Sequence, residues 1–152
     1  MMKNIFFIAI TFSTLIGCKS IQTTAGNDIN QQDRQMNELF VEANTWELIR
    51  YNGQLPEEAG FKRKIPTMVI NLSEKRVGGN SGCNSYGGEV IIEGNTMHLN
   101  RIMSTKMYCV DVPEHEFFQM LRQPLQFEIK DDVLSLEQEG VVILEFKLKK
   151  DQ

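Results

Sequence analysis

The chain has 152 residues, a formal net charge of −4 and 41% hydrophobic residues. This size suits one domain with one core. An acidic chain whose only dense basic run is Lys62-Arg63-Lys64 is a poor nucleic-acid binder, and we interpret that run as a solvated loop.

The first 17 residues have the pattern of a signal peptide. Lys3 lies in the positive n-region, residues 5–16 form a short apolar run, and Gly17 is the small residue before the cleavage site. A helix of this length spans about 18 Å, which is too short for a hydrocarbon core of about 30 Å. Because no second apolar run follows, we expect the mature chain not to cross a membrane.

Cys18 follows directly on this segment. Leu15, Gly17 and Cys18 resemble the bacterial lipobox, from which Ile16 departs because a small residue is usual there. The resemblance implies a diacylglycerol thioether on Cys18, and two or more acyl chains give stable anchoring. We therefore expect a lipid-anchored protein of the bacterial cell envelope, at the outer membrane, whose membrane contact is the lipid on Cys18. The alternative is a chance cysteine beside an ordinary cleavage site.

Polar residues dominate the region after Cys18. We interpret residues 18–43 as the lipidated N-terminus and a flexible tether, and residues 44–150 as the folded domain. Alternating apolar residues in the first half of this domain predict strands, separated by turns at Asn52-Gly53 and Glu93-Gly94-Asn95. These strands cover residues 46–51, 68–72, a short segment from 77, the segment through 90–92 and the segment 97–102.

One segment breaks the alternation. Asp111-Val112-Pro113-Glu114 has the form of a capping box with proline in the first helical turn. Phe117, Phe118 and Leu121 then share one helical face. The pattern predicts a helix over residues 112–122.

Three further strands are predicted after the helix, over residues 125–129, 133–137 and 141–148. Asp131-Asp132 is the expected tight turn between the first two. Seven or eight short antiparallel strands with one inserted helix predict a mainly β domain, either a sandwich or a small barrel.

Two cysteine-bearing motifs carry a family resemblance. The first contains Gly82-Cys83-Asn84 followed by Tyr86 and Gly87, and the second contains Thr105, Met107 and Cys109. Together they resemble the META-domain family of HslJ-like envelope proteins. Other residues that fit the family pattern are Trp46, Leu48, Glu116, Phe117, Leu121, Leu134 and Leu136. The resemblance covers about residues 44–148.

This resemblance implies a small antiparallel lipocalin-like barrel. The family has no settled activity, and its members have been associated with heat response, motility and secretion. The family pairs its two cysteines by position, which implies a disulfide between Cys83 and Cys109. An oxidising envelope favours such a bond, and closing the loop is worth roughly 3–4 kcal/mol by loop entropy.

A catalytic or metal-binding site has little support in the sequence. Gly79-Asn80-Ser81-Gly82 lacks the spacing of the Gly-x-Ser-x-Gly motif, so a hydrolase using Ser81 is a minor alternative. Met103, Met107 and Cys109 are soft copper ligands, but a disulfide would remove the thiolate. We expect no metal and no other cofactor.

The expected function is non-enzymatic. We expect a binding or accessory module linked to envelope stress, with Asn84, Tyr86 and Thr105 as the candidate binding surface. The partner would be an unidentified envelope protein or small molecule and not a nucleic acid. The alternative is an inhibitor of an envelope-targeting enzyme such as lysozyme, although Ser81-Gly82 followed by Tyr86 does not suit that loop motif.

Overall fold

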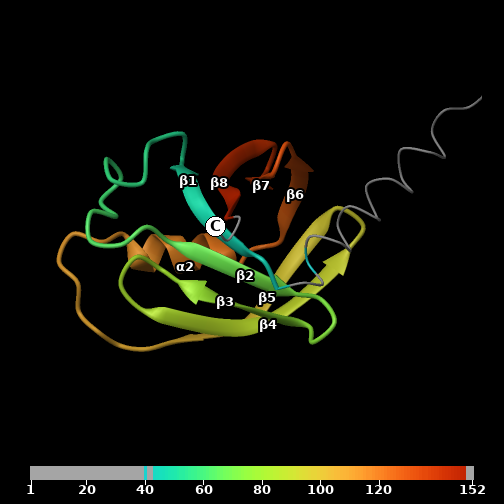
Figure 1. The fold of residues 1–152 in the computed structure, drawn as a ribbon, viewed down its shortest axis with the longest axis horizontal. Helices are drawn as coiled ribbons and strands as arrows, with labels where there is room; N and C mark the ends of the chain where they lie inside the picture. Colours follow the sequence, from blue (N-terminus) through green and yellow to red (C-terminus); the bar gives the residue numbers. More distant parts are fainter. Residues whose placement is uncertain (1–39, 41–42, 150–152) are drawn as a thin grey trace, which may run out of the picture.

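Eight antiparallel strands form one closed sheet in the computed structural model, which describes residue 40 and residues 43–149 (Figure 1). Each strand pairs with the next, and β8 returns to pair with β1. The strands are β1 Thr45–Tyr51, β2 Thr67–Asn71, β3 Arg76–Asn80, β4 Ser85–Glu93, β5 Thr96–Ser104, β6 Leu125–Lys130, β7 Val133–Gln138 and β8 Val141–Lys149, with helix α2 Glu114–Leu121 between β5 and β6. The predicted mainly β, antiparallel barrel with one inserted helix is confirmed.

The predicted signal peptide and Cys18 lie outside the described residues. Phe40 falls within the segment that we expected to be a tether, yet its side chain is fully buried. Its ring lies 5.9 Å from that of Trp46 and 6.1 Å from that of Phe127. The packed part of the chain therefore begins before residue 44.

The interior of the barrel is filled by the chain's own side chains. The alternation predicted from the sequence sends every second residue inward, as with Leu134 and Leu136 of β7. Trp46, Met68 and Phe146 have no exposed surface. Together these residues belong to one hydrophobic core cluster.

Helix α2 completes the core where two strands diverge. β5 pairs with β6 only through Thr96 and Met97, so the rest of β5 has no partner in β6. α2 buries Phe117, Phe118 and Leu121. The ring of Phe117 lies 6.1 Å from that of Phe61 and 6.2 Å from that of Tyr86. An aromatic cluster thus ties the helix to β4 and to the β1–β2 connection.

The predicted capping box is wrong. The N-cap of α2 is Pro113, and no side chain caps the helix. Asp111 is exposed, with a φ of 59°. The Glu114 carboxylate turns instead towards Ser81 and Asn84. These buried donors would be costly to leave unpaired, whereas water can satisfy an exposed helix end.

Three connections gather at one end of the barrel. β1, β3 and β5 run in the same direction because neighbouring strands are antiparallel, so residues 52–66, 81–84 and 105–113 all lie at the end that these strands reach (Figure 1). Gly82 shows how closely they pack. Its φ is 92°, and a Cβ there would lie 2.5 Å from Cδ1 of Phe61.

Within residues 43–149 and Phe40, no helix has the length and apolar character needed to cross a membrane.

Tyr86 makes the stability of the barrel sensitive to alkaline pH. Burial raises the pKa of its phenol, whose hydroxyl donates a hydrogen bond of 3.1 Å to the Thr67 carbonyl. A raised folded-state pKa means that stability is complete below the unfolded value near 10 and falls as the pH rises above it.

We therefore expect Tyr86→Phe to lose about 1 kcal/mol at pH 7 and to lose stability less steeply than the parent above about pH 10. Urea unfolding at several pH values measures both. Tyr108→Phe, on a side chain that is 89% exposed, is the control. An alkaline decline of equal steepness in Tyr86→Phe and the parent would contradict the assignment.

Candidate functional site

The segment between β5 and α2, residues 105–113, has neither strand nor helical structure but is firmly held. We call it the pinned loop. The predicted disulfide between Cys83 and Cys109 is confirmed, with 6.0 Å between the Cα atoms, and it fastens the loop to the turn between β3 and β4. This bond joins the two motifs that carry the family resemblance.

The side chain of Asn84 is the second attachment. Its Nδ2 donates to the Met107 carbonyl at 3.0 Å, and its Oδ1 accepts from the Met107 amide at 2.7 Å. Oδ1 also accepts from the Thr105 hydroxyl at 2.8 Å. One side-chain amide thus supplies the hydrogen bonds that a neighbouring strand would give.

Glu114 connects the same turn to the helix. Its Oε2 accepts from the side-chain Nδ2 of Asn84 at 2.8 Å. Its Oε1 accepts from the backbone N–H of Asn84 at 3.2 Å and from the Ser81 hydroxyl. Ser81 is fully buried, and the single proton of its hydroxyl lies within reach of both Glu114 and the Asn84 carbonyl oxygen, which is 2.9 Å from Oγ. Ser81 is therefore a structural residue with no access to a substrate.

The binding surface predicted at Asn84, Tyr86 and Thr105 is largely wrong. Asn84 is 1% exposed and Tyr86 is 6% exposed. Thr105 is exposed, but its hydroxyl is committed to Asn84. The neighbouring glycines suggested an exposed loop, whereas Tyr86 belongs to β4 and points into the core.

The pinned loop instead exposes apolar side chains that the sequence analysis did not select. Tyr108 is 89% exposed, Val110 68% and Met107 56%, and Met103 at the end of β5 is 76% exposed. From the sequence, Met103 and Met107 were considered as soft copper ligands. These apolar residues follow neither strand nor helix periodicity, and this was the sequence signal that could have indicated their exposure.

Basic side chains surround this apolar group. A hollow of about 360 Å³ on one side of Tyr108 is lined in part by Lys106 and Arg122, and a hollow of about 390 Å³ on the other side by Lys62 and Arg63. Arg63 Nη1 lies 3.9 Å from the Cys109 sulfur. Tyr108 thus stands between two hollows that both carry cations.

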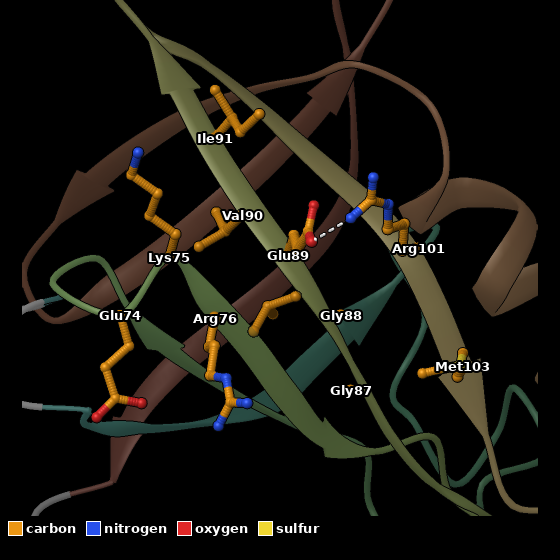
Figure 2. Close-up of a pocket in the computed structure, with 11 residues that line it drawn as sticks. Glu74, Lys75, Arg76, Gly87, Gly88, Glu89, Val90, Ile91, Arg101 and Met103 are labelled. Atoms are coloured by element: carbon orange, nitrogen blue, oxygen red, sulfur yellow. Dashed lines mark hydrogen bonds and ion pairs between the residues drawn. The ribbon is translucent and has the colours of Figure 1, made fainter.

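A larger hollow of about 770 Å³ lies over β3, β4 and β5 (Figure 2). Gly87 and Gly88 leave its floor bare of side chains, and glycine within a strand can mark a place of close approach. The Arg101 guanidinium crosses towards β4 and pairs with Glu89 at 2.8 Å (Figure 2). Charges of both signs line this groove, so it defines no single ligand chemistry.

Metal binding has no ligand set in the described part of the chain. No group of three or more His, Cys, Asp and Glu side chains there could hold a metal ion.

The fold and the site define a class: a small closed antiparallel barrel with one helix and a disulfide-fastened loop. The family model of the META domain matches residues 26–151, and the chain belongs to the META-domain family. The match begins upstream of residue 44, where we expected the domain to start. No curated protein matches the chain.

Three solved structures share the fold. A protein solved by NMR has a TM-score of 0.56 and 20% identity, over 71% of this chain and 91% of its own. An NMR structure from Burkholderia xenovorans has a TM-score of 0.56 and 16% identity, over 77% of this chain and 88% of its own. A crystal structure of a DUF4847 family protein from Bacteroides vulgatus has a TM-score of 0.51 and 17% identity, over 74% of this chain and 95% of its own. At these identities the likeness concerns the fold alone.

Asn84 should be among the most sensitive positions of the domain. Replacing it with alanine leaves the Met107 amide and carbonyl without their partner and removes one donor, Nδ2, from Glu114, while the backbone N–H of residue 84 remains. We expect Asn84→Ala to lower the free energy of unfolding by about 3 kcal/mol. Thr105→Val, which removes one of these hydrogen bonds, should cost about 1 kcal/mol. Urea unfolding of the oxidised protein measures both, and equal losses would refute the central role of Asn84.

The two adjacent glycines of the groove should differ in their tolerance of a side chain. A Cβ at Gly88 would lie 2.7 Å from the Asn100 carbonyl oxygen, whereas one at Gly87 meets nothing closer than 3.8 Å. We expect Gly88→Ala to cost about 1–3 kcal/mol and Gly87→Ala less than about 0.5 kcal/mol. Thermal unfolding of the two variants compares them, and the reverse order would show that the backbone approach has been misassigned.

Proposed function

We propose that this chain is a lipid-anchored, non-enzymatic binding or accessory module of the bacterial cell envelope, held at the outer membrane through Cys18 and linked to envelope stress. The observation that carries the binding role is the pinned loop. It exposes Met107, Tyr108 and Val110 on a segment that a disulfide and a buried amide hold in place.

Rigidity is what makes such a loop suited to binding. Binding costs less conformational entropy when the contact residues are already ordered. Tyrosine is enriched among the residues that dominate interface energies. An exposed apolar group that gives the domain no packing energy is therefore explained by contact with a partner.

The alternatives draw less support from the described residues. A hydrolase that uses Ser81 would need an accessible hydroxyl, and this one is buried between Asn84 and Glu114. Inhibition of lysozyme would require docking into an enzyme cleft, and only the same exposed loop is available to favour it.

The anchor is tested by mass spectrometry of the protein purified from bacterial membranes. We expect Cys18 to be the N-terminal residue and to carry diacylglycerol, and we expect Cys18→Ser to release the protein from the membrane fraction. An unacylated Cys18 in the mature protein would exclude the anchor.

The binding role is tested by photocrosslinking in intact cells. A benzophenone amino acid at position 108 should give specific adducts, whether with a protein or with lipid. The same probe at Val141, which is 62% exposed on the β7–β8 hairpin, is the matched control. Adducts no more frequent from position 108 than from position 141 would reject the pinned loop as the contact surface.

A further inference from the structure

We infer that the partner of the pinned loop is an anionic lipid bilayer, against which the loop and its flanking cations dock. This inference rests on the proposed function, because it names the partner of the same loop. It draws on two independent properties of the surface: the kind of apolar side chain that is exposed and the sign of the charges around it.

The exposed side chains suit the zone between lipid headgroups and acyl chains. Tyrosine is enriched at membrane interfaces, where its ring is apolar and its hydroxyl remains hydrated. Tyr108 is 89% exposed, and Met107 and Val110 flank it on the same loop. Met107 and Val110 thus add apolar surface beside Tyr108, and this surface can enter the same interfacial zone of the bilayer.

The charges around Tyr108 have the sign that anionic lipid requires. Lys106 and Arg122 line one neighbouring hollow, and Lys62 and Arg63 line the other. Basic residues near an anionic bilayer are attracted to its negative surface potential. The chain as a whole carries a charge of −4, so this cationic surface is a local exception that would orient the domain.

The acidic groups beside this surface oppose the attraction only weakly. Asp111 lines one hollow and is exposed. Glu114 lines the other, but its two carboxylate oxygens accept hydrogen bonds from Ser81 and Asn84. Among the described residues that line the two hollows, four cations therefore face two carboxylates, so the local charge remains positive.

The shape of the surface favours a bilayer over a folded protein. Tyr108 protrudes between two hollows and does not line a single cleft. A protein partner would need a pocket to receive it, whereas a bilayer accepts a protruding apolar tip and surrounds it with headgroups. If Cys18 is lipidated, the domain also remains close to the bilayer, so a weak interfacial contact becomes effective through high local concentration.

The test uses the oxidised, unlipidated chain from residue 19 onward, which contains every described residue of the closed barrel. Its binding to phosphatidylcholine vesicles with and without phosphatidylglycerol is measured by co-sedimentation. We expect binding only to the anionic vesicles, and we expect added salt to weaken it because salt screens exposed charges.

Two double variants separate the two contributions. Met107→Ser with Tyr108→Ser removes the apolar tip, and Arg63→Glu with Lys106→Glu reverses two cations. Each pair should lower the vesicle partition coefficient by about tenfold or more. Val141→Ser with Val142→Ser is the matched control, because these valines are 62% and 43% exposed but have Glu139 and no cation near them in sequence. This control should change the coefficient by less than about twofold.

All variants are checked for the parent's unfolding midpoint in urea, so a loss of binding cannot be a loss of fold. Absence of binding to anionic vesicles would overturn the inference. Equal binding by the parent and by the two double variants, the Met107/Tyr108 pair and the Arg63/Lys106 pair, would also overturn it. Full competition by soluble glycerophosphate would also overturn it, because it would indicate a headgroup site and not a bilayer surface. Protein adducts from position 108 without vesicle binding would reject the bilayer while leaving the proposed binding role intact.

Discussion

The buried side-chain amide of Asn84 is the constraint on which this end of the molecule depends. It bonds the pinned loop through Met107 and Thr105 and bonds α2 through Glu114. The turn at residues 81–84 is far in sequence from the pinned loop, which runs directly into α2, so this one side chain joins two distant parts of the chain. Because both amide atoms are buried, any movement of one partner would leave a polar group unpaired.

The disulfide acts beside this network and by a different mechanism. A covalent link restricts the unfolded chain, whereas the Asn84 hydrogen bonds specify where the loop rests in the folded one. The two together explain how a segment without regular structure can display Met107, Tyr108 and Val110 without collapsing onto the core. Among the residues of the second family motif, Thr105 and Cys109 hold the loop, and Met107 holds it through its backbone while its side chain is exposed beside Tyr108.

The sequence predicted most of the fold because the strands obey simple alternation. Trp46 and Leu48, Leu134 and Leu136 all point inward as expected. The site was harder to predict, since it depends on competition between partners. Glu114 fits a capping box locally, but Asn84 and Ser81 are buried donors that bind it more strongly than an exposed helix end.

The cationic surface could not have been predicted from the spacing of basic residues in the sequence. Lys62 and Arg63 form a short basic run that we interpreted as a solvated loop, while Lys106 and Arg122 are isolated in the sequence. Only the fold places them around one exposed tyrosine. The error at Tyr86 is of the opposite kind. The adjacent glycines suggested an exposed loop, but they form part of β4 and the Tyr86 side chain is buried.

The early divergence of β5 from β6 also bears on self-association. Pairing between these strands stops at Met97, so the later part of β5 presents a strand edge that β6 does not cover. Exposed strand edges can recruit strands from other copies of a chain, and charged or kinked residues discourage this. Arg101 supplies the kink, because its φ of 51° interrupts the extended backbone, while its guanidinium pairs with Glu89 of β4. A break of this kind in the extended backbone disfavours the addition of a further strand along that edge.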